Sequence, residues 1–274
     1  GANAHGLYNS DMASHSYSCR ITWNSGSSTY DFSGAPSGTA SDWQNRPVNF
    51  ISWYDAAMFS NWATSGSIHQ GAYDTSAAAG WGSYTASDYT GITPHDSAAM
   101  DTLVSVYGKV YVIPTKDEWY KAAYYDGDND VYYDYPTGSN TEPGRDMTEA
   151  TKPGNNANYF GNPFLLDSPY HATLCGEFEL SDSPYGTFDQ GGNVWEWNET
   201  LYEWSNSSFR CKPGGSLFDF DYGVDVLHAS AGGTGEPTTG TVIYGFRVAS
   251  IPEPSTMAVL VLGGLTVLRR RRSD

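Results

Sequence analysis

Six short segments rich in aromatic residues and glycine constrain the fold of this chain more than any other feature of its sequence. They follow one another between residues 46 and 250, separated by long stretches without a sustained hydrophobic period. Aromatic rings supply large apolar area and glycines allow tight turns, so the segments predict a core built mostly from loops. They are RPVNFISWYDAAMFSNW (46–62), VIPTKDEWYKAAYY (112–125), NNANYFGN (155–162), YGTFDQGGNVWEW (185–197), GGS (214–216) and YGFRVAS (244–250).

The first two segments carry helix-start signals. Ser52 followed by Asp55 is similar to a capping box and predicts a helix that ends near Ala63. The residues expected on its buried face, or beside that face, are Ala56, Phe59, Ala63 and Trp62. In the second segment, Thr115 and Glu118 form a capping box after a short strand at 110–113. Trp119, Ala122 and Ala123 then fall on one helical face.

The remaining stretches predict loops and short strands. Aromatic residues make up 15% of the chain and charged residues only 16%, with 30 Gly and 14 Pro, a composition that favours turns. We expect a strand near residues 17–23, an aperiodic insertion over 64–105, and a strand with Tyr244, Phe246 and Val248 on one face. With no linker evident, residues 1–250 predict one α+β domain with two short helices and short antiparallel strands.

The formal net charge of −17 excludes one class of partner and permits others. An acidic surface repels phosphate backbones, so we expect no nucleic-acid partner, whereas divalent cations are compatible with it.

Residues 251–274 form a separate tail. Pro252-Glu253-Pro254 leads into an apolar run from Met257 to Leu268, and four arginines follow at 269–272. The run is short for a spanning helix of about 20 residues, although it allows transient membrane insertion with the arginines held in the cytoplasm. The tail resembles the PEP-CTERM sorting signal of bacterial envelope proteins. That resemblance implies export, processing by an exosortase-type enzyme, and an envelope or extracellular location; a plain tail anchor is the alternative.

Common catalytic and metal-binding patterns are absent from the sequence. Cys19, Cys175 and Cys211 form no CxxC pair, and their odd number leaves at least one outside any internal disulfide, with the pairing open. The six histidines are isolated, and neither a GxSxG elbow nor a phosphate-binding loop occurs. The acidic run 126–130 starts like an EF-hand loop, but Val131 and Thr137 occupy the positions that need Gly and Glu, so we expect a solvated turn.

Taken together, the six segments resemble the formylglycine-generating enzyme family, also called sulfatase-modifying factors, over residues 46–250. The resemblance implies the C-type-lectin-like fold. It also implies structural calcium, held by the side chains of Asp189 and Glu196 and the carbonyls of Gly192 and Val194. A second calcium site would use Asn158 and the carbonyl of Tyr159, with Asp167 as a further candidate ligand. Such domains usually begin with a further strand and helix, so the resemblance also predicts that the domain is truncated before Gly1.

The resemblance breaks at the catalytic centre. The oxidases of the family hold copper(I) with two cysteines, at the third and eighth positions after the serine of the GGS segment, and here those positions are Asp219 and Val224. A carboxylate and an isopropyl group cannot replace two soft thiolates, so we expect no copper site and no catalytic residues. We therefore expect a non-catalytic, calcium-stabilised module that binds a glycan or an envelope protein, or that has a structural role. The alternative is a formylglycine-generating oxidase or a divergent enzyme of the family.

Overall fold

The computed structural model describes residues 6–75, 97–148, 154–202 and 209–251. The chain divides into two compact units. Unit 1 comprises residues 1–56 and 113–247, and unit 2 comprises residues 57–112 together with the chain from 248 onwards. The predicted aromatic and glycine segments fall mainly in unit 1.

The helices of unit 1 are short, and two of them start with a complete capping box. They are α1 (Asp11–Ser14), α2 (Ala40–Gln44), α5 (Lys116–Tyr124) and the 3-10 helix η3 (Gly223–Leu227). In α5 the Thr115 hydroxyl accepts from the Glu118 amide at 3.2 Å, while Glu118 accepts from the Thr115 amide at 2.9 Å. The predicted helix start at Thr115 is confirmed.

Helix α3 (Trp53–Ser65) begins in unit 1 and continues in unit 2. Its predicted start is also confirmed, because the Ser52 hydroxyl accepts from the Asp55 amide at 3.1 Å and Asp55 accepts from the Ser52 amide at 2.8 Å. The predicted buried face is wrong in part, since Phe59 and Trp62 are exposed. Ala56 is buried as predicted, and the other buried residues of the helix are Trp53, Tyr54, Ala57, Met58, Ser60 and Asn61.

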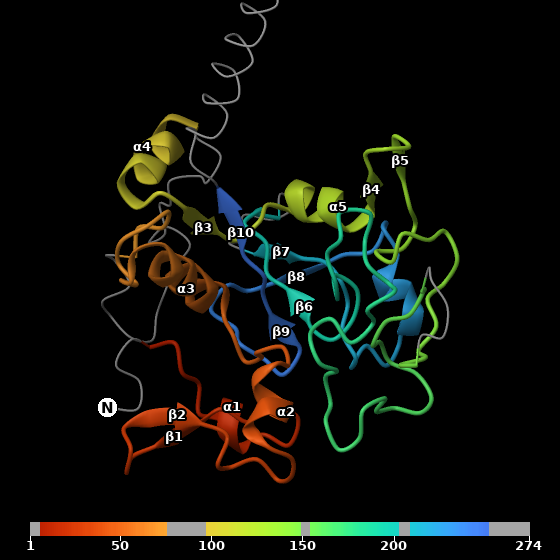
Figure 1. The fold of residues 1–274 in the computed structure, drawn as a ribbon, viewed down its shortest axis with the longest axis horizontal. Coiled ribbons are helices and arrows are strands. Elements are labelled where there is room, and N and C mark those ends of the chain that lie inside the picture. The colour runs from red at the N-terminus through yellow and green to blue at the C-terminus, as the bar shows by residue number, and fades with distance from the viewer. Residues whose placement is uncertain (1–5, 76–96, 149–153, 203–208, 252–274) are drawn as a thin grey trace, which may run out of the picture. The chain divides into compact units, whose positions relative to one another are not determined.

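Strand pairs in the described residues have two or three residues per strand (Figure 1). Of the pairs described in unit 1, three are antiparallel and one is parallel. These pairs are β1 (Thr22–Asn24) with β2 (Thr29–Asp31), β4 (Tyr125–Asp126) with β5 (Val131–Tyr132), β6 (Trp195–Glu196) with β9 (Tyr244–Gly245), and β7 (Arg210–Lys212) with β8 (Gly233–Gly235). The β6–β9 pair is parallel and sets Trp195 opposite Tyr244.

Three buried tryptophans form the centre of unit 1. Trp53, Trp119 and Trp197 are almost fully buried, and each ring N–H donates a hydrogen bond. The acceptors are the carbonyl of Asn198 at 3.1 Å, the carboxylate of Glu196 at 2.6 Å and the carbonyl of Ile51 at 2.8 Å, respectively. A buried indole N–H without an acceptor would destabilise the fold, so these bonds fix which loops lie against the rings.

Unit 2 contains the rest of α3, helix α4 (Ser97–Tyr107), and the antiparallel pair of β3 (Val110–Val112) with β10 (Ala249–Ile251). The buried side-chain amide of Asn61 donates to the carbonyls of Ile68 and Tyr73 and accepts from the Tyr73 amide. This one side chain therefore satisfies several main-chain groups of the loop that follows α3.

Two other expectations differ from the structure. The stretch 64–105 was predicted to lack periodicity, yet its end forms α4, in which Met100 and Val104 are buried one turn apart. The stretch 244–248 was predicted as one strand, yet β9 ends at Gly245 and Val248 is exposed. In both cases the apolar pattern was too short to distinguish the outcomes. The acidic run 126–130 lies in the exposed β4–β5 turn, as predicted.

Candidate functional site

The glycine turn at residues 189–193 positions the acidic residues of the site. Asp189, Gly192 and Asn193 all have positive φ angles, of 55°, 88° and 55°. A Cβ atom at Gly192 would clash with the main chain of Asn158, so the turn needs glycine there. The Asn193 amide donates to the Asn158 carbonyl at 2.7 Å. The turn is thereby fixed against the segment that carries the second predicted calcium ligands.

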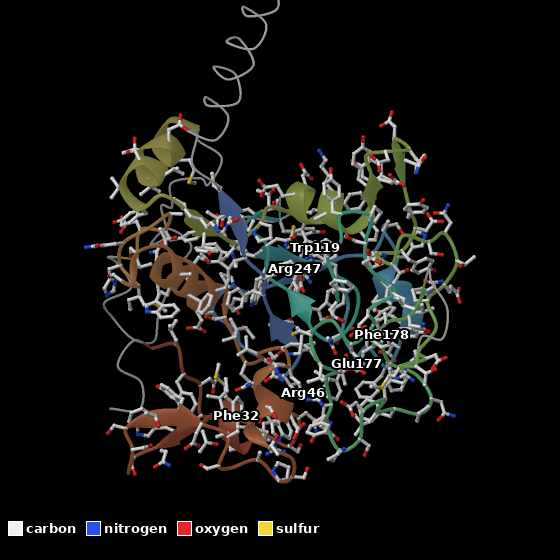
Figure 2. All side chains as sticks on the ribbon, in the orientation of Figure 1. Phe32, Arg46, Trp119, Glu177, Phe178 and Arg247 are labelled. Atoms are coloured by element: carbon white, nitrogen blue, oxygen red, sulfur yellow. The ribbon has the colours of Figure 1, made fainter. Side chains whose placement is uncertain are left out.

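Glu196, in β6, is the most heavily bonded acidic residue of the site. Its Oε1 accepts from Arg247 Nη2 at 2.7 Å, and its Oε2 accepts from Arg247 Nε at 2.5 Å and from Trp119 Nε1 at 2.6 Å. Figure 2 shows Trp119 and Arg247 close together in unit 1. A two-point guanidinium contact and an indole hydrogen bond fix this buried carboxylate in place.

A cavity of about 400 Å³ opens beside this pair. Its walls carry both predicted acidic calcium ligands, the arginine and a thiol, next to aromatic rings. Lining residues include Asp189, Glu196, Arg247, Cys175, Phe188 and Phe246. The structure thus brings Asp189 and Glu196 to one cavity, although they come from a turn and from a strand.

Asp189 lies in an environment that disfavours its charge. Burial raises the pKa of its carboxyl to about 6, against the lowering effects of the Gly176 amide and Arg247, while Glu196 raises the pKa further. The Gly176 amide donates to Asp189 Oδ2 at 2.5 Å. A cation in the cavity would favour the ionised form of this carboxyl.

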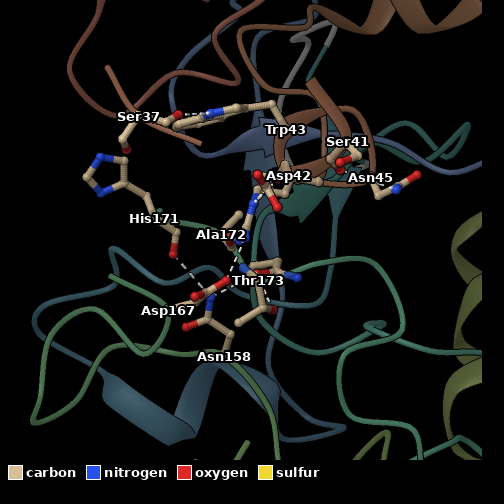
Figure 3. A network of polar contacts seen from close by, with 12 residues as sticks. Ser37, Ser41, Asp42, Trp43, Asn45, Asn158, Asp167, His171, Ala172 and Thr173 are labelled. Atoms are coloured by element: carbon tan, nitrogen blue, oxygen red, sulfur yellow. Dashed lines mark hydrogen bonds and ion pairs between the residues drawn. The ribbon is translucent and has the colours of Figure 1, made fainter. Parts of the chain in front are cut away.

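The second predicted set centres on Asn158, which is buried (Figure 3). Its Nδ2 donates to Asn193 Oδ1 at 2.9 Å and to the His171 carbonyl at 3.3 Å. No residue in the described ranges donates a hydrogen bond to its buried Oδ1. An amide oxygen left without a donor is a suitable ligand for a hard cation.

The side chains of the other two residues of this set have partners of their own, which says nothing of the Tyr159 carbonyl that was predicted as a ligand. The Tyr159 hydroxyl donates to the Pro143 carbonyl at 2.7 Å. Asp167 accepts from Arg46 Nη2 at 2.6 Å, and Arg46 also bonds the Ala172 carbonyl in the network of Figure 3. The structure therefore uses Asp167 to hold its loop to Arg46.

The residues present fit a hard cation in part. Asp189 and Asn158 offer oxygens that other groups do not fully satisfy, whereas both oxygens of Glu196 are already bonded to cationic or N–H groups. Within the described residues, no three His, Cys, Asp or Glu side chains cluster closely enough to hold a metal by themselves. A calcium ion would thus need main-chain and amide oxygens as well, as the resemblance predicts for Gly192, Val194 and Tyr159.

Asp219 and Val224, the two positions that the resemblance matches to the copper cysteines, have structural contacts. Asp219 Oδ2 accepts from the Ser216 amide at 2.6 Å and from the Ser216 hydroxyl at 2.8 Å, and its Oδ1 accepts from Trp195 Nε1 at 3.2 Å. Val224 packs against the apolar cluster that contains Tyr135 and Leu227. A carboxylate that ties a turn to an indole and a valine in a core are both fold-stabilising residues.

No disulfide joins the three cysteines in the described part of the chain. Cys19 is buried, Cys175 lines the 400 Å³ cavity, and Cys211 lies in β7 beside a different cavity. Burial raises the pKa of the Cys175 thiol to about 11, and Asp189 adds to the effect. Burial and the neighbouring carboxylate thus both disfavour the free thiolate of Cys175.

Sequence reasoning missed two charged residues of this region. Arg247 belongs to the YGFRVAS segment, but no local pattern pairs it with a glutamate 51 positions away. No pattern in the sequence indicated a role for Lys212. Its ammonium lies 4.8 Å from the Trp195 ring and 4.6 Å from the Tyr244 ring, and burial lowers its pKa to about 8, opposed by Asp219.

Comparisons with known proteins agree with the resemblance read from the sequence. The family model described as sulfatase-modifying factor enzyme 1-like domain matches residues 4–251, a wider range than the 46–250 expected. The model of the PEP-CTERM protein-sorting motif matches residues 250–272. A search of curated proteins gave no match.

Three solved structures illustrate the structural similarity. The structure of CarF shares 21% identity, with 77% of this chain and 69% of that chain covered and a TM-score of 0.44. Treponema denticola variable protein 1 shares 18% identity, with 80% and 74% covered and a TM-score of 0.44. PvdO from Pseudomonas aeruginosa shares 14% identity, with 76% and 62% covered and a TM-score of 0.43.

Proposed function

The chain belongs to the family of sulfatase-modifying factor enzyme 1-like domains, and on this premise we propose that it is a calcium-stabilised binding or structural module of the bacterial cell envelope, without the oxidase activity. The fold is that of the family: α+β and C-type-lectin-like, with short helices and short strands. What this chain retains of the family is the scaffold, and what it lacks is the pair of sulfur ligands.

One observation carries the proposal. By the resemblance, Asp219 and Val224 take the positions of the copper cysteines of the oxidases, and in the structure both have contacts that the fold uses. Carboxylate and aliphatic groups do not bind copper(I), which prefers thiolate and thioether ligands. Cys175 does not compensate, because it is the one cysteine among the described residues that lines the cavity beside Arg247, and a copper(I) site of this family needs two thiolates.

The sorting motif supports the envelope location. A PEP-CTERM motif at residues 250–272 indicates export and processing by exosortase-type machinery. No helix in the residues that the structure describes combines the length and apolar character needed to cross a membrane. The sequence-based expectation of transient membrane insertion concerns residues 257–268, which lie outside the described part of the chain.

Calcium is proposed for the oxygen-rich side of the site. Asp189, with the carbonyls of Gly192 and Val194, would hold one ion next to Glu196, and Asn158 with the Tyr159 carbonyl would help to hold a second. The raised pKa of Asp189 and the unsatisfied Oδ1 of Asn158 support this assignment. Each ion would bind oxygen atoms from separate loops and so hold these loops together.

A direct assay separates this function from the oxidase alternative. Copper-loaded protein is incubated with a cysteine-containing sulfatase peptide under oxygen, with an active oxidase of the family as the positive control. We expect mass spectrometry to show unchanged peptide with this protein and aldehyde with the control. Aldehyde formed at a rate near that of the control would overturn the proposal.

A further inference from the structure

Four tyrosines of unit 1 form a continuous row of rings, here called the tyrosine row: Tyr120, Tyr132, Tyr125 and Tyr185. Successive ring centroids are 5.6, 4.9 and 6.4 Å apart. The corresponding angles between ring planes are 39°, 41° and 32°. Each successive pair of rings is therefore tilted, and none of the three pairs is edge-to-face.

Local structure explains the row. Tyr120 comes from α5, while Tyr125 and Tyr132 are opposite each other in the β4–β5 pair. The hairpin turn is closed by Asp126, whose Oδ1 accepts from the amides of Asp128 and Asn129 at 2.9 and 3.2 Å. A short, internally bonded turn thus holds two of the rings at a fixed spacing.

The row is open to solvent. Tyr132 is 54% exposed and Tyr185 is 50% exposed, while Tyr120 and Tyr125 are half-buried. Within the described residues, the hydroxyls of Tyr120, Tyr132 and Tyr185 have no hydrogen-bond partner. Rings that served only to stabilise the hairpin would not need to leave this much apolar area and these polar groups in water.

A groove of about 330 Å³ adjoins the row. Tyr120 belongs to both, so the row and the groove form one continuous surface. Besides Tyr120, the groove is lined by aromatic, hydroxyl, basic and small residues: Trp119, Tyr124, Tyr202, Ser230, Thr234, Lys116, Lys212, Cys211, Pro213, Ala231, Gly232 and Gly233. The groove therefore offers aromatic rings next to hydroxyl and ammonium donors.

The chemistry of the surface matches a carbohydrate. The C–H faces of pyranose rings stack on phenol rings, and sugar hydroxyls exchange hydrogen bonds with tyrosine hydroxyls and with the exposed carboxylates of Asp128 and Asp130. The net charge of −17 disfavours an anionic polymer. A row of successive rings suits an extended chain of sugars better than a single sugar.

We infer that the tyrosine row and its groove bind a neutral linear polysaccharide, with sugar rings stacked on Tyr132 and Tyr185 and one end of the chain in the groove at Tyr120. The inference rests on the proposed function, a binding module outside the cytoplasm. It adds the surface and the class of ligand.

The test is retention of the full chain by neutral polysaccharides. Cellulose, chitin and xylan are used as probes, with anionic alginate for comparison. The variants are Tyr132→Ala and Tyr185→Ala, with Tyr132→Trp to keep an aromatic ring. Phe220→Ala is the matched control, because Phe220 is 61% exposed and packs with Phe160 in a separate aromatic cluster. Circular dichroism melts check that each variant is folded.

We expect at least one neutral probe to retain the wild-type protein, each alanine variant to weaken binding about tenfold, and the tryptophan and Phe220 variants to bind normally. Equal retention of all variants would overturn the location. Retention by alginate alone, or by no probe, would overturn the ligand class. Self-association that Tyr132→Ala abolishes, without retention by a glycan, would assign the row to a second copy of the chain. None of these results bears on the aldehyde assay, so the proposed function stands or fails separately.

Discussion

Asp189 is a residue of the site at which burial opposes the negative charge of the side chain. Its positive φ angle and its bond to the Gly176 amide keep the carboxyl in the cavity, where Glu196 is a second negative group. The carboxyl is therefore more stable protonated in the folded protein than in the unfolded chain.

The raised pKa of Asp189 makes the stability of the folded protein depend on pH. The folded pKa is raised from 3.8 to about 6, so the folded state binds more protons between these values and stability falls as pH rises through them. In EGTA we expect Asp189→Asn to stabilise the protein by about 1–2 kcal/mol at pH 7 and to have little effect at pH 4. Urea unfolding at both pH values measures this.

Asp55 is the matched reference for that experiment, because burial also raises its pKa to about 6 and the Ser52 hydrogen bonds oppose the shift. Asp55→Asn weakens a helix cap, so its gain should be smaller or absent. If Asp189→Asn destabilised the protein at pH 7 in EGTA, the interpretation of Asp189 as a strained carboxyl would be wrong.

For Asp219 we expect the opposite effect, because removing its carboxylate should destabilise the protein. Its carboxylate satisfies the Ser216 amide, the Ser216 hydroxyl and Trp195 Nε1. Asp219→Ala should lower the free energy of unfolding by about 1–3 kcal/mol, because partly buried donors lose their acceptor. The exposed Asp221 is the control, and its change to alanine should fall within about 0.5 kcal/mol of the wild type. Equal stability of the two variants would contradict the structural role of Asp219.

At the scale of elements, α5 shows how a local signal leads to the site. Its capping box sets the start of the helix, and the helix then places Trp119 against Glu196. Thr115→Ala should reduce stability by about 1 kcal/mol in denaturant titrations. Thr115→Ser keeps the hydroxyl and should retain most of that stability. A loss of the same size in both variants would show that packing of the methyl group, and not capping, is important.

Capping signals were the part of the fold that the sequence predicted best, since they depend on residues three positions apart. The box at Thr39 and Asp42 that starts α2 carries the same signal and was overlooked. The buried face of α3 was predicted wrongly because burial of Trp53 and exposure of Trp62 depend on packing with distant segments. In the site, Asp189 and Glu196 were predicted through the family resemblance. Arg247 could not be paired with Glu196, because only the closed fold brings residues 51 positions apart together.

At the scale of the whole molecule, loops dominate and buried side chains replace regular backbone pairing. Asn158, Asn193 and Asn198 are all buried in unit 1, and the three keep polar atoms without a hydrogen-bond partner in the described residues. Because few hydrogen bonds between paired strands hold these loops together, an ion that binds oxygens from separate loops would add to the stability of the folded state.

Calcium should therefore raise the thermal midpoint. A ligand present at about 100 times its Kd stabilises the folded state by about 2.7 kcal/mol, so calcium against EGTA should shift the midpoint by several degrees. Asp189→Asn should reduce the shift, whereas Asp221→Asn should leave it unchanged. An identical midpoint in calcium and EGTA would argue against a structural cation.

The central claim is that this chain keeps the scaffold of its family while its residues no longer bind copper, and a copper(I) titration tests it most directly. The protein competes with a chromophoric copper(I) chelator under anaerobic conditions, beside an active oxidase of the family. We predict that this chain leaves the chelator fully loaded, because Asp219 and Val224 offer no soft ligand. Removal of one equivalent of copper by the wild-type protein, lost in a Cys175→Ala variant, would contradict the account.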